Sequence, residues 1–205
     1  MTESPTSPRE RYRSQVRAEI MERAWEQIAT AGASALSLNA IAKQMGMSGP
    51  ALYRYFAGRD DLITELIRDA YRSLADTVQA TATDGPDLAA IGHAIRRWAL
   101  DDPNRYLLIY GTPIPGYHAP DDITGIANKI MAVLLAACRP IAEDDSPGAP
   151  MEVGWSEPTP AMRLTLSFWT RVHGVLSLEL AGHFTGMKLD PARLFETELG
   201  SLAHP

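Results

Sequence analysis

The sequence contains a single cysteine, Cys138, among its 205 residues. No intrachain disulfide can therefore form, and a reducing compartment is expected. The first residues, MTESPTSPRE, are polar and lack the apolar stretch of a signal peptide. The longest apolar stretch, residues 164–180, is interrupted by Arg171, His173 and Glu179. We predict that it is a buried helix of a cytoplasmic protein without a membrane partner.

Patterns for catalysis and metal binding are also scarce. The five histidines form no pair at the i,i+4 spacing and lie at no metal-binding distance in sequence from the cysteine. The chain has no Gly-rich phosphate loop, nucleophile elbow or C-x-x-C motif. Adjacent aspartates such as Asp60-Asp61 point apart on a helix and favour its first turn. We predict no metal, no cofactor and no enzymatic activity; an all-helical enzyme using His173 and an aspartate is the alternative.

Positive charge is scarce overall but unevenly distributed. The formal net charge is −6. Residues 1–59 hold eight Lys or Arg against five Glu, a balance of +3, so residues 60–205 carry −9. A basic N-terminal segment on an acidic remainder is typical of a small DNA-reading domain attached to a larger body that does not bind DNA.

Apolar residues recur at three- and four-residue spacings along most of the chain, and no segment alternates as a strand would. The sequence therefore predicts an all-α fold of about nine helices. The expected divisions are a mobile tail at 1–9, a helix-turn-helix domain at 10–58 and a ligand-binding and dimerisation body at 59–205. The predicted helices begin near residue 10 or 12 and cover 10–31, 38–45, 49–56, 59–80, 87–101, 104–110, 121–139, 161–184 and 191–202.

Residues 37–56 have the pattern of two short helices joined by a tight turn. Ser37 and Ser48 are placed to cap the two helices, and Gly46 lies where a left-handed residue ends the first. Four apolar residues are predicted to close a small core: Ile41, Met45, Leu52 and Phe56. Their burial leaves Ala51, Arg54 and Tyr55 facing outward and Tyr53 on the flank. Such a face can enter a major groove of DNA.

From Arg13 to Asp69 the chain resembles the TetR family of bacterial transcription regulators. The likeness is carried by Ser37-x-x-x-Ile41-Ala42, Gly46-Met47-Ser48, Leu52-Tyr53-Arg54-Tyr55-Phe56 and Arg59-Asp60-Asp61-Leu62-Ile63. The resemblance implies that Ser37, Tyr53 and Arg59 face phosphates, and that Arg54 and Tyr55 contact bases or phosphates. The full set of implied DNA-binding residues is Ser37, Ser48, Gly49, Pro50, Ala51, Tyr53, Arg54, Tyr55 and Arg59. Ala57 and Gly58 depart from the lysine or polar residue common there, which implies fewer phosphate contacts.

The C-terminal body resembles the TetR subfamily named for its Trp-His-Gly motif. The likeness is carried by Trp169-x-x-x-His173-Gly174 and by the upstream segment 110–117, YGTPIPGY. Trp169 and His173 lie one helical turn apart on the same face. They are either an ordinary core pair or part of an effector pocket. The predicted pocket residues are Trp98, Tyr106, Tyr110, Phe168, Trp169 and His173.

Together these patterns predict a homodimeric repressor that binds a palindromic operator in double-stranded DNA and is released by a small hydrophobic effector. Segment 161–184 is apolar around much of its circumference, so it is expected to pair with its symmetry mate together with 191–202. The acidic body favours a neutral or cationic effector over an anion. A constitutive DNA-binding regulator without an effector stays open as an alternative, as does activation in place of repression.

Overall fold

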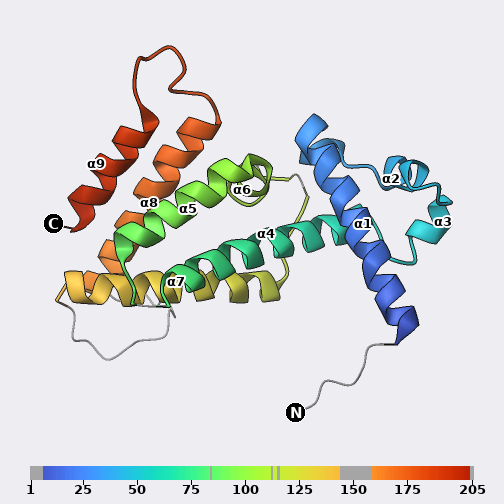
Figure 1. Ribbon diagram of the computed structural model, residues 1–205, viewed down its shortest axis with the longest axis horizontal. Coiled ribbons are helices and arrows are strands. Elements are labelled where there is room, and N and C mark those ends of the chain that lie inside the picture. Colours follow the sequence, from blue (N-terminus) through green and yellow to red (C-terminus); the bar gives the residue numbers. More distant parts are fainter. Residues whose placement is uncertain (1–6, 84, 112, 115, 144–157, 204–205) are drawn as a thin grey trace. The chain divides into compact units, whose positions relative to one another are not determined.

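The computed structural model describes residues 7–83, 85–111, 113–114, 116–143 and 158–203. These residues form nine α-helices and one 3-10 helix and contain no strand. The helices are α1 (Pro8–Ala31), α2 (Leu38–Gln44), α3 (Gly49–Leu52), α4 (Arg59–Thr81), α5 (Leu88–Asp101), α6 (Pro103–Tyr110), α7 (Asp121–Ile141), α8 (Pro160–Leu180) and α9 (Pro191–Ala203); the 3-10 helix η1 is Ala33–Ala35 (Figure 1). The predicted all-α fold is confirmed.

Packing divides the described residues into two units. One unit lies within Met1–Asp69 and Thr112–Ala119, and the other within Ala70–Gly111 and Pro120–Pro205. Helix α4 runs unbroken from the first unit into the second. We call the first unit the head and the second the body. The domain boundary predicted between residues 58 and 59 stays a prediction, and the tail predicted at 1–9 lies mostly outside the described residues.

The head is organised by caps that can be read in the sequence. A capping box of Ser7 and Glu10 begins α1, and Gly32, with a φ of 78°, ends it. Gly46 has a φ of 64°, which L side chains rarely adopt, and it follows α2 as predicted. Ile41, Leu52 and Phe56 are fully buried, whereas Met45 is half-buried. The small core predicted for the helix-turn-helix is therefore present.

The third helix is shorter than predicted. Sequence periodicity predicts a helix over 49–56, but α3 ends at Leu52 and continues as turns. The carbonyls of Arg54 and Tyr55 instead accept hydrogen bonds from Arg13 and Arg17 of α1. The amides of Arg54 and Tyr55 donate to the carbonyls of Ala51 and Leu52, three residues back, so the segment tightens into turns and does not continue the α-helix.

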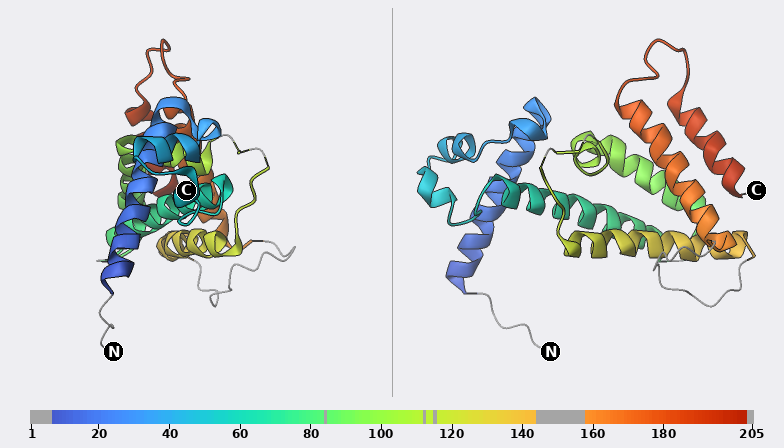
Figure 2. Two further views of the ribbon diagram at one scale, coloured as in Figure 1. Left: turned by 90° about the vertical axis from the view of Figure 1, so that its right-hand side faces the viewer. Right: turned by 180° about the vertical axis from the view of Figure 1, so that it is seen from behind.

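The body is built around one apolar core. Its fully buried residues come from the six helices α4 to α9 and include Leu74 of α4, Ile91 of α5, Leu134 of α7 and Phe195 of α9. Gly92 lies against the Leu199 side chain, and a Cβ at residue 92 would come within 2.7 Å of it. This glycine therefore permits the close packing of α5 on α9. Helices α8 and α9 pack side by side, as the right-hand view of Figure 2 shows.

Helix α7 is long and apolar enough, by length and composition alone, to cross a membrane. The stretch 164–180, the longest apolar stretch of the sequence, lies in α8 and not in this helix. Ile123, Ile130 and Leu134 are buried, whereas the exposed positions of α7 include Asn128 and Lys129. One apolar face and one polar face are typical of a helix packed on the core of a globular domain.

Several helix ends in the body differ from the predictions. Helix α7 continues past the predicted end at residue 139 to Ile141, with Pro140 in its last turn. Helix α8 ends at Leu180, four residues before the predicted end at Phe184, because the following backbone turns at Gly182. Thr81, Leu88 and Pro103 each lie one residue from the predicted ends of their helices. Most of the predicted acidic connection, 143–160, lies outside the described residues.

Candidate DNA-binding surface and effector site

The recognition segment, residues 48–56, presents polar side chains on a buried apolar base. Tyr53 is 49% exposed and Arg54 is exposed, while Ala51 and Tyr55 are half-buried. Leu52 and Phe56 are fully buried beneath them. Ser48 and Pro50 are also exposed, and Gly49 is half-buried. This arrangement can offer hydroxyl and guanidinium groups to the edge of a base or to a phosphate.

The two predicted serine caps differ. The Ser37 hydroxyl accepts a hydrogen bond from the Ala40 amide, at 3.4 Å, and caps α2 as predicted. The Ser48 side chain makes no capping hydrogen bond, so that prediction is wrong. The reason is local: Pro50 has no N–H, and the Ala51 amide donates to the Ser48 carbonyl instead. The Ser48 hydroxyl is left exposed at the start of the recognition segment.

Arg59 is held inside the head. Its guanidinium donates to the carbonyls of Ala33, Ser34 and Leu36, at 2.9, 3.2 and 3.3 Å respectively. It also lies 3.8 Å from the carboxylate of Asp60. These contacts attach the start of α4 to the end of η1. The structure therefore gives Arg59 an internal structural role; the phosphate contact implied by the family resemblance stays a prediction.

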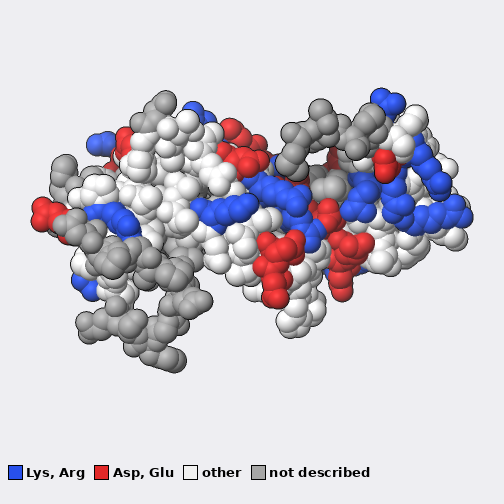
Figure 3. Space-filling model, turned by 90° about the horizontal axis from the view of Figure 1, so that it is seen from below, with Lys and Arg blue, Asp and Glu red and all other residues white. Residues whose placement is uncertain are grey.

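Sequence reasoning missed two arginines of α1. Arg13 donates to the carbonyl of Arg54, and Arg17 donates to the carbonyl of Tyr55. The two arginines are four residues apart, which places both side chains on one face of α1. The sequence shows this spacing, but it does not show that the two side chains reach residues some 40 positions away. Figure 3 shows Lys and Arg side chains gathered on the head, at the right of the view.

The body brings four of the six predicted pocket residues into contact. The rings of Trp169 and His173 lie 4.1 Å apart, those of Tyr110 and His173 4.2 Å, and those of Tyr106 and Tyr110 5.3 Å. Tyr71 of α4, which was not predicted, joins the cluster because its ring lies edge-on to Tyr110 at 6.0 Å. We call these five residues the aromatic cluster.

The other two predicted pocket residues, Trp98 and Phe168, belong to the same core. Among the described residues, neither makes a ring contact with a member of the aromatic cluster. Trp98 is 9% exposed, and its indole N–H donates to the hydroxyl of Ser73 on α4 at 3.0 Å. Phe168 is fully buried. In Trp98 the polar indole N–H has a hydrogen-bond partner, and the Phe168 side chain is wholly apolar. Packing in the core, without a ligand, accounts for their burial.

His173 is the chemically distinctive member of the aromatic cluster. The Tyr106 hydroxyl lies 3.0 Å from His173 Nδ1 and 2.9 Å from the Ser177 hydroxyl. Nε2 of His173 is buried and has no hydrogen-bond partner among the residues that the structure describes. Burial lowers the pKa of His173 to about 4, so the imidazole is neutral at pH 7. Burial also raises the pKa of Tyr110 and Tyr106 above the ordinary value of tyrosine.

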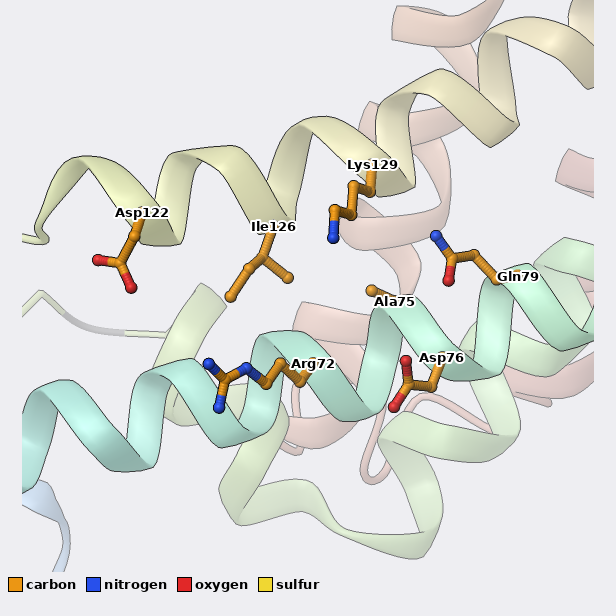
Figure 4. A pocket seen from close by; sticks show the side chains of 7 residues that line it. All are labelled: Arg72, Ala75, Asp76, Gln79, Asp122, Ile126 and Lys129. Carbon is orange, nitrogen blue, oxygen red and sulfur yellow. The ribbon is translucent and has the colours of Figure 1, made fainter. Parts of the chain in front are cut away.

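A groove lies between α4 and α7. This groove has a volume of about 220 Å³ and is lined by Arg72, Ala75, Asp76, Gln79, Asp122, Ile126 and Lys129 (Figure 4). Two cations and two carboxylates give its lining no net charge, and most of these side chains are exposed. Charge and burial therefore favour no ligand class here, unlike in the aromatic cluster.

Other candidate chemistry finds no support in the geometry. The described residues contain no group of three or more His, Cys, Asp or Glu arranged to hold a metal ion. Cys138 is buried, and burial raises the pKa of its thiol, which disfavours the reactive thiolate. Among the contacts described no aspartate joins His173, so the two residue types of the enzymatic alternative do not come together.

Two known protein families match separate segments of the chain. Residues 20–66 match the family described as bacterial regulatory proteins, tetR family, and residues 88–202 match the family described as tetracyclin repressor-like, C-terminal domain. The HTH-type transcriptional regulator Rv1816 of Mycobacterium tuberculosis is 37% identical over 210 residues, with 91% of this chain and 90% of that protein covered.

Solved structures agree in fold. The crystal structure of SCO4313 is 64% identical, covers 96% of this chain and 98% of its own, and has a TM-score of 0.86. A TetR family regulator from Marinobacter aquaeolei VT8, at 20% identity, covers 93% of this chain and 97% of its own with a TM-score of 0.64; this likeness concerns the fold alone. The chain therefore belongs to the TetR family of helix-turn-helix, DNA-binding transcription regulators, a family without enzymatic activity.

Proposed function

We propose that this regulator is a cytoplasmic homodimer that binds a palindromic operator and is released from it by a small, neutral, largely aromatic effector. The observation that carries the proposal is the aromatic cluster. It combines a neutral histidine with an unpartnered buried nitrogen, and through Tyr71 it includes α4, the helix that continues into the head. Trp169, His173 and Gly174 further support assignment of the body to the Trp-His-Gly subgroup.

The dimer is supported by an exposed stripe along α8. Leu166 and Leu178 are 45% and 44% exposed, and Thr170 and Gly174 between them are exposed as well. These four residues are spaced by four and are symmetric about residue 172. Antiparallel pairing of two α8 helices about a two-fold axis would place Leu166 of one protomer opposite Leu178 of the other, and Thr170 opposite Gly174. A self-complementary stripe of this kind suits an isologous interface.

A dimer also matches the proposed operator. Two recognition segments held about 34–36 Å apart can enter successive major grooves on one side of the duplex. Ser37, Ser48, Tyr53, Arg54 and Tyr55 are the residues that we propose to contact DNA, with Gly49, Pro50 and Ala51 allowing close approach. Arg59 would contribute mainly by fixing the start of α4 within the head.

Arg54→Ala is expected to weaken operator binding about 5- to 150-fold, the effect of one lost base contact. The Arg54 side chain is exposed, so the melting temperature should change little. Fluorescence anisotropy with a duplex selected by the wild-type protein from a random pool measures the affinity. Lys129→Ala, an exposed cation of the body, is the control. An unchanged affinity for Arg54→Ala would remove this residue from the DNA contact surface.

The effector class follows from the lining of the aromatic cluster. A neutral imidazole and phenol rings favour a planar, uncharged ligand over a carboxylate or an ammonium ion. With Nδ1 facing the Tyr106 hydroxyl, Nε2 of His173 is placed to form one hydrogen bond with a polar atom of the ligand. Binding that repacks Tyr110 would act on Tyr71, and thereby on α4, at a typical coupling of about 1–3 kcal/mol.

The effector response can be tested by tryptophan fluorescence. A panel of neutral aromatic compounds bearing one hydrogen-bonding group is expected to contain members that raise the melting temperature and change the emission of Trp169, whose ring lies 5.7 Å from Tyr110. Trp169→Phe should remove the emission change, whereas Trp25→Phe in the head should retain it. A panel that changes neither signal would favour the constitutive regulator, in which the cluster is only core.

A further inference from the structure

Arg17 joins three elements of the head at one guanidinium. It lies on α1, and its Nη1 donates to the carbonyl of Tyr55 in the recognition segment. Its guanidinium carbon lies 4.2 Å from the centre of the Phe56 ring, and its Nη2 lies 3.4 Å from the Glu65 carboxylate of α4. We infer that Arg17 is a positioning residue, which holds the recognition segment in its DNA-reading geometry and ties that geometry to α4 through Glu65.

The recognition segment needs such support because it has little of its own. Helix α3 comprises only Gly49–Leu52, and isolated helices of this length are unstable. After Leu52 the backbone forms turns, so the directions of Arg54 and Tyr55 depend on contacts from outside the segment. Arg13 supplies a second support, since it donates to the Arg54 carbonyl at 3.2 Å and lies 5.8 Å from the Tyr55 ring centre.

The burial of the contact favours a positioning role over a phosphate contact. The Arg17 side chain is 31% exposed and that of Glu65 is 25% exposed. Both terminal nitrogens of Arg17 face groups of the head itself, and one face of its guanidinium covers Phe56. A planar guanidinium can make these three contacts together, which a lysine ammonium cannot.

Glu65 connects the contacts of Arg17 to α4. It also pairs with Arg68 on α4, three residues away, so its carboxylate is held from its own helix. A displacement of this part of α4 would therefore move the partner of Arg17, and with it the support of the Tyr55 carbonyl. The inference goes beyond effector binding, because it concerns how the head is set for DNA whatever molecule the body binds.

The test is a set of four variants: Arg17→Gln, Glu65→Gln, the double variant, and Arg23→Gln as the matched control. Arg23 lies on the same helix and pairs only with Glu26 of α1 among the contacts described. Operator affinity is measured by fluorescence anisotropy at several salt concentrations, with a duplex selected by the wild-type protein. Thermal denaturation is recorded for each variant.

Arg17→Gln is expected to lower operator affinity about 5- to 150-fold, as loss of one well-placed base contact does. The dependence of affinity on salt should stay that of the wild type, because no phosphate contact is lost. Glu65→Gln should lower affinity less than Arg17→Gln does. The double variant should bind about as Arg17→Gln does, because both substitutions remove the contact between Arg17 and Glu65. Arg23→Gln should bind as the wild type does.

Two results would overturn the inference. An unchanged affinity for Arg17→Gln would show that the segment holds its geometry without this residue, and a salt slope reduced by about 1 would make Arg17 a direct phosphate contact. If Arg17→Gln does not fold, Glu65→Gln decides: an affinity equal to the wild type would refute the connection to α4.

Discussion

Replacing Gly174 with glutamate is expected to convert the protein to a monomer and to weaken operator binding by about 10²- to 10⁴-fold, the usual gain from linking two binding modules. Gly174 lies at the centre of the exposed α8 stripe, and apart from its chain neighbours and the adjacent backbone of α8 no described atom lies within 4 Å of the position that a Cβ would take. A glutamate therefore fits the single chain, and it is a better helix former than glycine. In the proposed interface it would place a charge against Thr170 of the other protomer, where desolvation opposes association.

Sedimentation velocity at micromolar concentration measures the change in association, and circular dichroism verifies that the helices persist. Gly125→Glu is the matched control: Gly125 is an exposed glycine within α7, and its Cβ position is equally open. This variant should remain dimeric and bind the operator as before. A Gly174→Glu protein that sediments as a dimer would place the interface away from the α8 stripe.

The protein is expected to lose about 2 kcal/mol of its free energy of unfolding between pH 7 and pH 5 through His173 alone. Burial holds the pKa of His173 at about 4, while a histidine in the unfolded chain has a pKa near 6.5. As the pH falls below about 6.5, the His173 imidazole binds a proton in the unfolded state but stays neutral in the folded state. Protonation therefore favours unfolding, and the loss ends only below about pH 4, where the folded state is protonated too.

Urea denaturation of the wild type and of His173→Asn at both pH values isolates this contribution. The variant is expected to be less stable at pH 7, because the contact with Tyr106 is disturbed, but to lose less stability on acidification. His118→Asn serves as the control, because His118 is exposed in the loop between α6 and α7 and should leave the pH dependence unchanged. Equal acid sensitivity of the wild type and His173→Asn would mean that His173 is solvated in solution.

The two proposed roles of α8, dimerisation and effector binding, rest on different residues of the helix. Trp169 and His173 face the aromatic cluster, whereas Leu166, Gly174 and Leu178 are exposed. A variant of the stripe should therefore keep the fluorescence response to an effector, and a variant of His173 should keep the dimer. Measuring both properties in both variants separates a failure of association from a failure of ligand binding.

The sequence by itself determined the helical architecture and the helix-turn-helix, because both depend on local signals. Ser37 caps α2 and Gly46 adopts the left-handed conformation whatever packs around them, and the spacing of Leu52 and Phe56 places both in the core. Only the tertiary structure showed that the third helix ends at Leu52 and that Arg13 and Arg17 hold the carbonyls of Arg54 and Tyr55 across some 40 residues of sequence. It likewise turned Arg59 inward, separated Trp98 and Phe168 from the aromatic cluster, and added Tyr71 to it. Side-chain contacts between distant segments depend on how the helices pack, and periodicity along one helix carries no information about them.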